Sequence, residues 1–596
     1  MNACFSGSAI HAVAIRAMLL LGTGACLVGC GEPLPRPAVQ SAADNATVDP
    51  SSDRVTLPVI ATDARTAVDD WFEDVTAKAA VDFTYHNGQE GANYFILESL
   101  GGGVAMFDFD GDDNLDLFFT GGGTISAPPV EIAGLPGALY RNREHGQFAE
   151  VTHQAGLRHA AGYSHGCAVG DYDCDGWPDL LVCCYGGCRL YRNQGDGHFR
   201  DVTEDVGLSA PGWNTAAAWA DADRDGFPDL YVVQYLQWGP DAAQACRNRQ
   251  GDREVCSPGR YKGAGDRLFR NRGDGSLEDV SSRAGIAAAG NGLGVVAADV
   301  NADGWIDFYV ANDESNNHLY LGGPGLRFEE RGMSAGVGTN EYGMHDGGMG
   351  VDAGDYDGDG KLDLWVTNFE SEDNALYQNL GDNSFAQTTV AAGLAGHSRS
   401  LVGFGTGLAD FDSDGWLDIF VVNGHVFYHG GQRPYLQPAQ LFRNLAGKRF
   451  ANISSSGGSY FRTPHASRGA AVGDLDNDGA LDLVVVSQNA PATLLQNRRW
   501  PASFLRVKLI GTDSERCAVG ATVVADYKGR RVARTIRGGA GYFSHSDQRI
   551  VFPIGEQGPT DVHVTWPSGR REIFSGLQPN TTHALIEGQG EPQTSS

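Results

Sequence analysis

The chain has 596 residues, of which 82 are glycine, 10% are aromatic and only 20% are charged. A chain of this length is too long to fold around one ordinary hydrophobic core. The composition favours many short strands and tight turns over long amphipathic helices. The formal net charge of −30 argues against nucleic acid as a partner, because phosphates would be repelled.

The first 66 residues are predicted to target and tether the protein. Arg16 precedes an apolar stretch, residues 17–28, that is too short to span a bilayer. The following Leu27-Val28-Gly29-Cys30 resembles the lipobox of bacterial lipoproteins, which implies a signal peptide over 1–29 and lipidation of Cys30. A plain secretory signal is the alternative. Residues 30–66, rich in Pro, Ala, Ser and Asp, are predicted to be a flexible tether.

Seven related acidic segments then recur along the chain, and we number them loops 1 to 7. Each places carboxylates at its first, third, fifth and ninth positions, with a glycine at the fourth or sixth, as in DYDGDGKLDL. The four positions are Asp108, Asp110, Asp112 and Asp116 in loop 1; Asp171, Asp173, Asp175 and Asp179 in loop 2; Asp221, Asp223, Asp225 and Asp229 in loop 3; Asp299, Asn301, Asp303 and Asp307 in loop 4; Asp355, Asp357, Asp359 and Asp363 in loop 5; Asp410, Asp412, Asp414 and Asp418 in loop 6; and Asp474, Asp476, Asp478 and Asp482 in loop 7.

The flanking sequence predicts a β-propeller. Each loop lies between two apolar runs, which is typical of a β-hairpin, and a second hairpin follows, as in RLYRN (189–193) and FRDVT (199–203). Four strands per repeat make one propeller blade, so an all-β, seven-bladed β-propeller is expected over residues 67–500. The last repeat has a third strand, TLLQN (493–497), but no fourth. The orphan segment FEDVT (72–76) is therefore predicted to pair with it and close the ring.

The loops have the ligand chemistry of a calcium site. Carboxylates at positions one, three, five and nine, with the backbone carbonyl at position seven, supply the oxygens that a hard divalent cation needs. No His or Cys occupies a ligand position, which disfavours zinc. Asp and Gly also favour plain turns, but seven copies in register favour up to seven Ca²⁺ ions of structural rather than catalytic type. Loop 4 is the weakest candidate because Asn301 replaces an aspartate.

The cysteines agree with export. Cys246 and Cys256 bracket a polar insertion, so a disulfide is predicted there. Cys167, Cys174, Cys183, Cys184 and Cys188 crowd into one repeat without zinc spacing, which leaves disulfides or buried thiols; the pairing of these five and Cys517 stays open.

The tail alternates apolar and polar residues and predicts a small antiparallel β-domain over 501–590, followed by a tail at 591–596. The loops resemble FG-GAP or VCBS-type repeats, and FLRVKLIGTDSERCAVGATVVA (504–525), GGAGYFSHSD (538–547) and VTWPSGRREIF (564–574) resemble an ASPIC/UnbV domain. Together they identify the chain as a bacterial member of the cartilage acidic protein family. The segment 538–547 is either a binding loop or a Gly-rich edge.

Two classes of function follow. The resemblance implies a calcium-binding, non-catalytic adhesion module, lipid-anchored at the outer membrane or cell surface, which binds a protein or a glycan and contacts the membrane through its lipid only. The alternative is a carbohydrate-active lyase or dehydratase that uses His165, His345 or His425, although such histidines are more often packed or hydrogen-bonded residues. Arg272-Gly273-Asp274 spells an integrin-recognition tripeptide but lies at a predicted hairpin turn.

Overall fold

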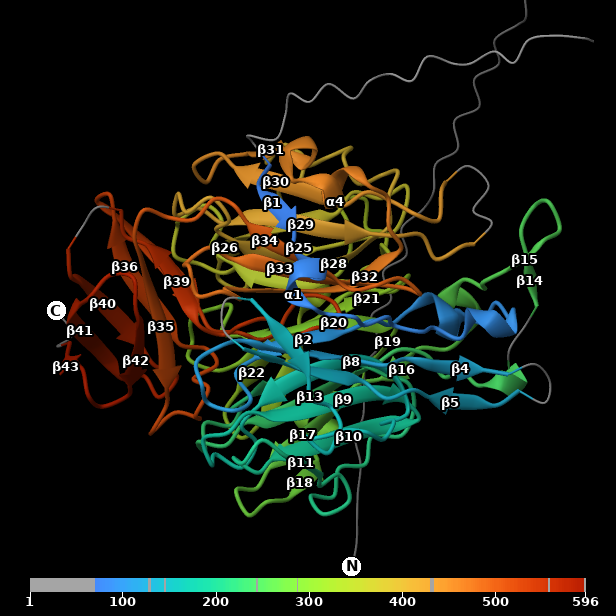
Figure 1. Ribbon diagram of the computed structural model, residues 1–596, viewed down its shortest axis with the longest axis horizontal. Coiled ribbons are helices and arrows are strands. Elements are labelled where there is room, and N and C mark those ends of the chain that lie inside the picture. The colour runs from blue at the N-terminus through green and yellow to red at the C-terminus, as the bar shows by residue number, and fades with distance from the viewer. Residues whose placement is uncertain are drawn as a thin grey trace, which may run out of the picture. The chain divides into compact units, whose positions relative to one another are not determined.

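The computed structural model describes residues 70–126, 130–143, 146–242, 245–286, 288–428, 433–555 and 558–593. The predicted signal peptide, the tether and Cys30 lie outside the described residues. Short strands make up most of the regular secondary structure of the described chain (Figure 1).

Among the described residues, seven sheets each contain one acidic loop. Sheet 1 holds β2 (Val104–Phe107), β3 (Asp116–Phe119), β6 (Ala138–Asn142) and β7 (Phe148–Glu150), and sheet 2 holds β8 (Tyr163–Gly170), β9 (Asp179–Tyr185), β10 (Gly187–Asn193) and β11 (Phe199–Asp201). Sheet 3 holds β12 (Asn214–Ala220), β13 (Asp229–Gln234), β17 (Arg267–Asn271) and β18 (Leu277–Asp279), and sheet 4 holds β20 (Gly292–Ala298), β21 (Asp307–Asn312), β22 (His318–Gly323) and β23 (Arg327–Glu330).

The remaining sheets repeat the same order. Sheet 5 holds β24 (Val351–Gly354), β25 (Asp363–Val366), β26 (Ala375–Gly381) and β27 (Ser384–Gln387), and sheet 6 holds β28 (Gly403–Ala409), β29 (Asp418–Asn423), β30 (Gln440–Asn444) and β31 (Phe450–Asn452). Sheet 7 holds β32 (Ser467–Gly473), β33 (Asp482–Ser487), β34 (Thr493–Asn497) and β1 (Phe72–Asp74). The first strand of each sheet lies beside that of the next, which fits a β-propeller.

The two ends of the repeat region meet in sheet 7. β1 pairs antiparallel with β34, with Phe72 opposite Asn497, as the sequence predicts. Phe72 is buried and packs against Phe411 and Phe461 of sheet 6 and the helix that follows it. The N-terminal strand therefore supplies a sheet edge that the rest of the repeat lacks.

Short helices and extra hairpins decorate the sheets. The helices are α1 (Thr76–Ala79), α2 (Ser281–Ala284), α3 (Gly332–Ala335) and α4 (Ser459–Arg462). β4 (Gly123–Ile125) pairs with β5 (Ile132–Gly134), β16 (Ala264–Gly265) with β19 (Ala289–Gly290), and β14 (Cys246–Arg247) with β15 (Arg253–Glu254). Cys246 and Cys256 form the predicted disulfide beside the last of these hairpins.

The sequence left open whether six other cysteines form disulfides or remain thiols, and in the described part of the chain they are free thiols. Cys167, Cys174, Cys183, Cys184, Cys188 and Cys517 are free among the described residues, and the first and the three at 183, 184 and 188 are buried. Cys183 and Cys188 face each other across β9 and β10. Their burial among apolar side chains makes them core residues of sheet 2.

The C-terminal strands form a separate two-sheet unit. One sheet has the order β39 (Ile550–Pro553), β35 (Phe504–Ile510) and β42 (Thr582–Ile586); the other has β37 (Arg530–Thr535), β36 (Thr522–Tyr527), β40 (Thr560–Thr565), β41 (Arg571–Leu577) and β43 (Glu591–Pro592). The prediction of a wholly antiparallel domain is wrong at one pair, because β35 and β42 run parallel. The chain between them is long enough to return to the starting edge of the sheet, which a parallel pair requires.

The glycine-rich segment 538–547 leaves this unit and enters the centre of the repeat sheets. β38 (Gly538–Gly539) pairs with β20 along the edge opposite β21, and His545 bridges to Ala105 of β2. The Gly541 amide donates to Val351 in sheet 5, and the Asp547 amide donates to Val472 in sheet 7. The segment is therefore neither a free binding loop nor a free edge: it ties together the innermost strands of several sheets.

Candidate metal sites in the acidic loops

All seven loops fold as the same turn between the first two strands of a sheet. In loop 2, both oxygens of Asp171 accept backbone N–H groups, from Asp175 at 3.0 Å and from Gly176 at 2.8 Å. Asp175 in turn accepts the Trp177 amide at 3.0 Å. The fifth-position carboxylate makes this last bond in every loop. The carboxylates at positions one and five are thus held in place by the backbone before any cation binds.

The ninth aspartate has a structural role that the sequence reading missed. Asp179 is fully buried, and its two oxygens accept the Tyr172 amide at 3.0 Å and the Asn193 amide at 2.8 Å. The same pair of bonds joins the loop to the third strand in every sheet, at Asp116, Asp179, Asp229, Asp307, Asp363, Asp418 and Asp482. The residue therefore ties three strands together as well as facing the other carboxylates.

Five third-position aspartates contain a buried oxygen that has no hydrogen-bond partner among the described residues. In each case it is Oδ1, of Asp110, Asp173, Asp223, Asp412 and Asp476. A buried carboxylate oxygen left unpaired is costly, and native proteins usually satisfy such atoms. The same vacancy in hydrogen bonding, at the same atom of five loops, fits a bound cation that satisfies these oxygens.

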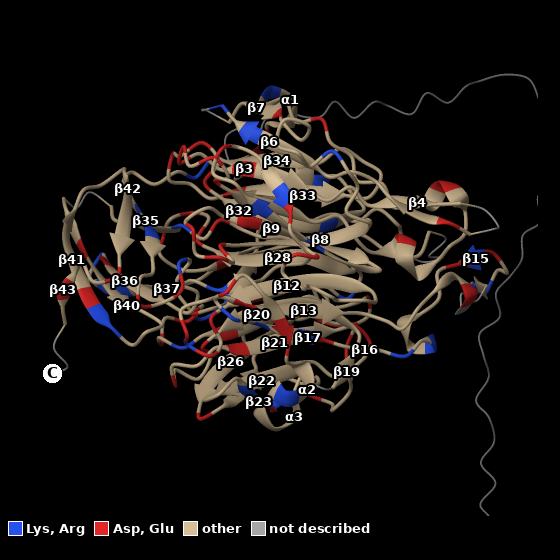
Figure 2. Ribbon diagram, turned by 90° about the horizontal axis from the view of Figure 1, so that it is seen from below, with Lys and Arg blue, Asp and Glu red and all other residues tan. Residues whose placement is uncertain are grey.

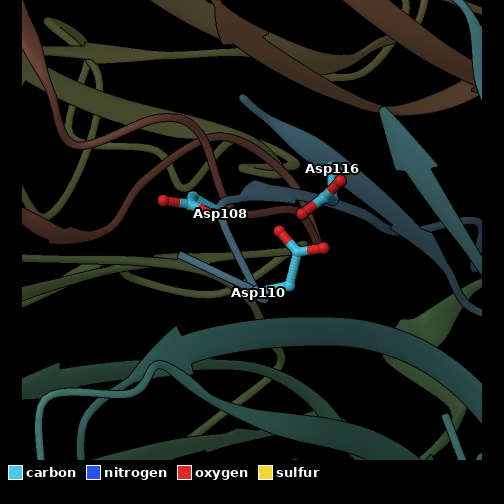
Figure 3. A group of neighbouring side chains, drawn as sticks. All are labelled: Asp108, Asp110 and Asp116. Carbon is cyan, nitrogen blue, oxygen red and sulfur yellow. The ribbon is translucent and has the colours of Figure 1, made fainter. Parts of the chain in front are cut away.

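The ligand oxygens converge. Figure 3 shows the side chains of Asp110 and Asp116 turned toward each other, with Asp108 beside them, and one oxygen from each of the three lies within 4.8 Å of the others. Equivalent groups form at Asp171, Asp173 and Asp179; at Asp221, Asp223 and Asp225; at Asp355, Asp357 and Asp359; and at Asp410, Asp412 and Asp418. All-carboxylate donor sets suit calcium or another hard dication better than zinc.

Burial makes these clusters reluctant to ionise without a cation. Desolvation raises the pKa of Asp116 to about 8, of Asp363 to about 8 and of Asp179 to about 9. Neighbouring carboxylates raise the same pKa values further by repulsion. A divalent cation reverses this effect, because it stabilises the charged form of every carboxylate around it.

Arginine side chains of the C-terminal unit form ion pairs with aspartates of loops 6 and 7. Arg506 of β35 forms a buried ion pair with Asp474, and Arg534 of β37 lies 3.6 Å from Asp410. Arg537 pairs with the buried Asp352 of β24. A cavity of about 760 Å³ lies between this unit and the loops, lined in part by Asp299, Asp355 and Asp410. Figure 2 shows Lys and Arg side by side with Asp and Glu where the C-terminal strands approach the loops.

A repeated asparagine links six of the seven loops to the next sheet, which the sequence reading also missed. Asn193 of β10 donates to the Phe109 carbonyl of loop 1 at 2.8 Å, and Asn271 of β17 donates to the Tyr172 carbonyl of loop 2 at 2.7 Å. Asn142, Asn379, Asn444 and Asn497 make the equivalent bond. Its signal was the final letter of the recurrent LYRN pattern. In sheet 4, Gly322 takes its place.

Two of the histidines named for an enzyme are buried, and His425 Nε2 also lies 3.7 Å from a carboxylate oxygen of Glu370. His165 is buried and accepts a hydrogen bond from Trp213 at 2.9 Å, while His425 is buried and accepts one from the Phe427 amide at 2.9 Å. Desolvation lowers the pKa of His165 to about 3 and that of His425 to about 4. His345 is exposed in a loop. Two of the three are thus packed residues within the ring.

The tripeptide 272–274 is a hairpin turn. Arg272 pairs with Glu278 at 2.9 Å, and Asp274 accepts the Ser276 amide at 3.0 Å. These contacts explain the residues without a partner protein.

The fold and the loops define an all-β repeat protein of β-propeller type with one acidic hairpin in each repeat. The chain matches the FG-GAP-like repeat family at residues 108–182, 171–232, 248–310, 299–366, 355–421 and 410–485, and it matches ASPIC and UnbV at 511–592. These repeat matches cover most of the chain, which therefore belongs to the FG-GAP-like repeat family.

The chain is also similar in sequence to two curated proteins. Cartilage acidic protein 1 of Xenopus tropicalis is 26% identical over 511 residues, covering 72% of this chain and 72% of that protein. Cartilage acidic protein 1 of Homo sapiens is 28% identical over 389 residues, covering 52% of this chain and 57% of that protein. The chain thus spans less than two thirds of the human relative's length.

Solved structures with some likeness include two lectins. The BP39L lectin from Burkholderia pseudomallei has a TM-score of 0.40 at 9% identity, covering 67% of this chain and 97% of that one. An Agrocybe aegerita lectin that recognises N-acetylglucosamine has a TM-score of 0.37 at 15% identity, covering 66% of this chain and 87% of that one. Scores of this size carry no argument about function.

Proposed function

We propose that the protein is a closed seven-bladed propeller that calcium stabilises and that acts as a non-catalytic binding module outside the cytoplasm. The observation that carries the calcium assignment is the buried, unpaired Oδ1 atom found at the third position of five loops. The family match supports it, because the matched repeats contain all seven loops.

Ring closure rests on two contacts between the ends of the repeat region. β1 completes sheet 7, and Asn142 of sheet 1 bonds to loop 7. Removing residues 68–80 should expose the edge of β34 and destabilise the whole ring rather than sheet 7 alone. Thermal melting checks this: an unchanged transition after the deletion would contradict closure.

Calcium binding is tested by melting the protein in metal-free buffer and in millimolar calcium. We expect the melting temperature to rise with calcium over roughly 10⁻⁴ to 10⁻³ M, the range of extracellular calcium modules. Magnesium at the same concentration is the control, because it prefers fewer protein ligands. Identical melting curves with and without calcium would rule the assignment out.

The partner is proposed to be a surface or extracellular protein or a glycan, and the protein is proposed to be exported and anchored through lipid at Cys30. Among the described residues, no helix has the length and apolar character needed to cross a membrane. Capture on a glycan array and from an extracellular protein fraction, in calcium and then in chelator, tests the binding role. A sugar consumed without any retained partner would instead favour the carbohydrate-active alternative, which the burial of His165 and His425 disfavours.

A further inference from the structure

One side chain on the third strand of a sheet reaches back to the acidic loop of the same sheet in six of the seven sheets. It is the residue immediately before the repeat asparagine or its substitute. The seven residues are Arg141, Arg192, Arg270, Leu321, Gln378, Arg443 and Gln496. None of them is a predicted ligand, yet six of the seven bind a carboxylate that is one.

The four arginines bridge the third and fifth positions of their loops. In loop 2, Arg192 Nε lies 2.6 Å from Asp173 Oδ2, and its Nη2 lies 2.9 Å from Asp175 Oδ2. Arg141, Arg270 and Arg443 make the same two contacts in loops 1, 3 and 6. Each guanidinium occupies Oδ2 of the third aspartate and leaves its buried Oδ1 free. The arginine therefore adds a positive charge beside the proposed site without occupying the ligand atom.

The two glutamines hold the same carboxylate without the charge. Gln378 Nε2 donates to Asp357 Oδ2 at 2.6 Å, and Gln496 donates to Asp476 Oδ2. Oδ2 of the third-position aspartate is thus held in both kinds of loop, although in loop 5 Oδ1 of Asp357 also accepts the Asp359 amide at 3.2 Å. What differs is the unit charge of the guanidinium and its second bond, to position five.

Loop 4 supports a link between the strand residue before the asparagine position and the third residue of the loop. Its strand residue is Leu321, which offers no hydrogen bond, and its third position is Asn301 instead of aspartate. Asn301 Nδ2 donates to Asp303 Oδ2 at 3.0 Å, a contact within the loop. Where the strand supplies no polar partner, the third position carries no charge.

We propose that the residue before the repeat asparagine sets the cation affinity of each loop, and that arginine weakens binding where glutamine does not. The inference rests on the proposed calcium function. A guanidinium one carboxylate away from a divalent cation repels it, and Arg192 is 37% exposed, so a dielectric near that of water applies. At a separation of about 6 Å, this repulsion corresponds to roughly a tenfold loss of affinity.

Three loops contain their own optical probe. Tryptophan occupies the seventh position of loops 2, 4 and 6, at Trp177, Trp305 and Trp416, the position expected to supply a backbone carbonyl to the cation. Terbium, a hard cation of calcium's size, luminesces when excited through such a neighbouring indole. The Trp177 indole also lies against Gly111 of loop 1. With Trp305 and Trp416 changed to Phe, and with Asp110→Asn and Asp112→Asn removing ligands from loop 1, Trp177 reports loop 2, and displacement by calcium gives the calcium affinity of that loop.

The decisive comparison is Arg192→Gln in this background, which copies the natural glutamine of loops 5 and 7. We expect terbium and calcium to bind loop 2 roughly tenfold more tightly. Arg189→Gln is the matched control: it removes the same charge from the same strand, but Arg189 Nε donates to the Ala161 carbonyl at 3.4 Å, away from the loop. In the Arg189→Gln variant, loop 2 should bind terbium and calcium with the same affinity as in the parent.

The outcomes separate the two proposals. No sensitised terbium in the parent would overturn the calcium function and this inference with it. Binding in the parent with an unchanged or weaker constant in Arg192→Gln would overturn this inference alone and would make the arginine an orienting residue. A melting curve of each variant in calcium identifies any that fail to fold. If Arg192→Gln fails, Arg443→Gln repeats the test in loop 6, with Trp416 retained and with Trp177 and Trp305 changed to Phe. Because Trp416 lies against Gly358 of loop 5, Asp357→Asn and Asp359→Asn are added to remove ligands there.

Discussion

The side-chain amide of Asn142 donates a hydrogen bond of 2.9 Å to the backbone carbonyl of Leu475, 333 residues further along the chain. The same amide donates to Leu115 at 3.1 Å. One buried side chain therefore joins the first sheet of the repeat region to the last loop.

Replacing Asn142 with Leu should destabilise the protein by about 1–3 kcal/mol, because two buried carbonyls lose their donor. Asn497→Leu is the matched comparison, since Asn497 makes the equivalent bond to Phe411 at 2.8 Å between sheets 7 and 6. Urea denaturation of both variants checks the prediction. In a closed ring the two losses are similar; a neutral Asn142→Leu beside a costly Asn497→Leu would show that the junction between the chain's ends is not formed.

The glycine-rich segment makes a second prediction possible. A Cβ added to Gly538 would lie 2.3 Å from the Trp219 carbonyl, so Gly538→Val should expel residues 538–547 from the centre of the sheets. Hydrogen exchange at the amides of Gly541, His545 and Asp547, which bond to three different sheets, measures the release. Gly558→Val is the control, because nothing lies within 4 Å of a Cβ built there. Unaltered protection in Gly538→Val would mean that the segment is held elsewhere.

The sequence predicted the strands and turns within each repeat better than it predicted the contacts between repeats. The period-two apolar runs and the Asp/Gly turns predicted the hairpins and the pairing of residues 72–76 with 493–497, because strand patterns and turn chemistry are short-range signals. The entry of residues 538–547 among the sheets could not be read in this way. Its backbone partners, such as Val295 and Val351, lie in sheets 4 and 5, more than 180 residues earlier in the chain, and become neighbours only when the sheets assemble. The bond between Arg192 and Asp173 was also missed, although both letters recur in each repeat.

We expect the disulfide to stabilise the insertion that it closes rather than the whole protein. Cys246 and Cys256 close a short insertion, for which the chain-entropy estimate is at most about 3 kcal/mol. Reduction should open residues 247–255 to trypsin, which cleaves after Arg247, Arg249 and Arg253, while the main melting transition moves little. In the double variant Cys246→Ser, Cys256→Ser, cleavage should be fast with or without reductant. Resistance of that variant to trypsin would show that contacts such as Arg253 to the Asn93 carbonyl, 2.7 Å, suffice to hold the insertion.

The raised carboxyl pKa values predict how calcium stabilisation depends on pH. Without cations, the folded chain holds protons on Asp116, Asp363 and Asp179 up to about pH 8 to 9, whereas the unfolded chain releases them near pH 4. The stability that these groups contribute is therefore full below pH 4 and is lost as the pH rises through 8 to 9.

Bound to the loops as proposed, calcium would hold the same carboxylates charged, restore that lost stability and displace protons. The rise in melting temperature caused by calcium should consequently be larger at pH 9 than at pH 6, measured against protein in metal-free buffer. Calorimetry in two buffers of different ionisation enthalpy should detect protons released at pH 7. Asp179→Asn is the control for loop 2: it keeps the shape of the side chain and should remove that loop's share of the proton release. An equal calcium effect at both pH values would mean that the ions do not bind these buried carboxylates.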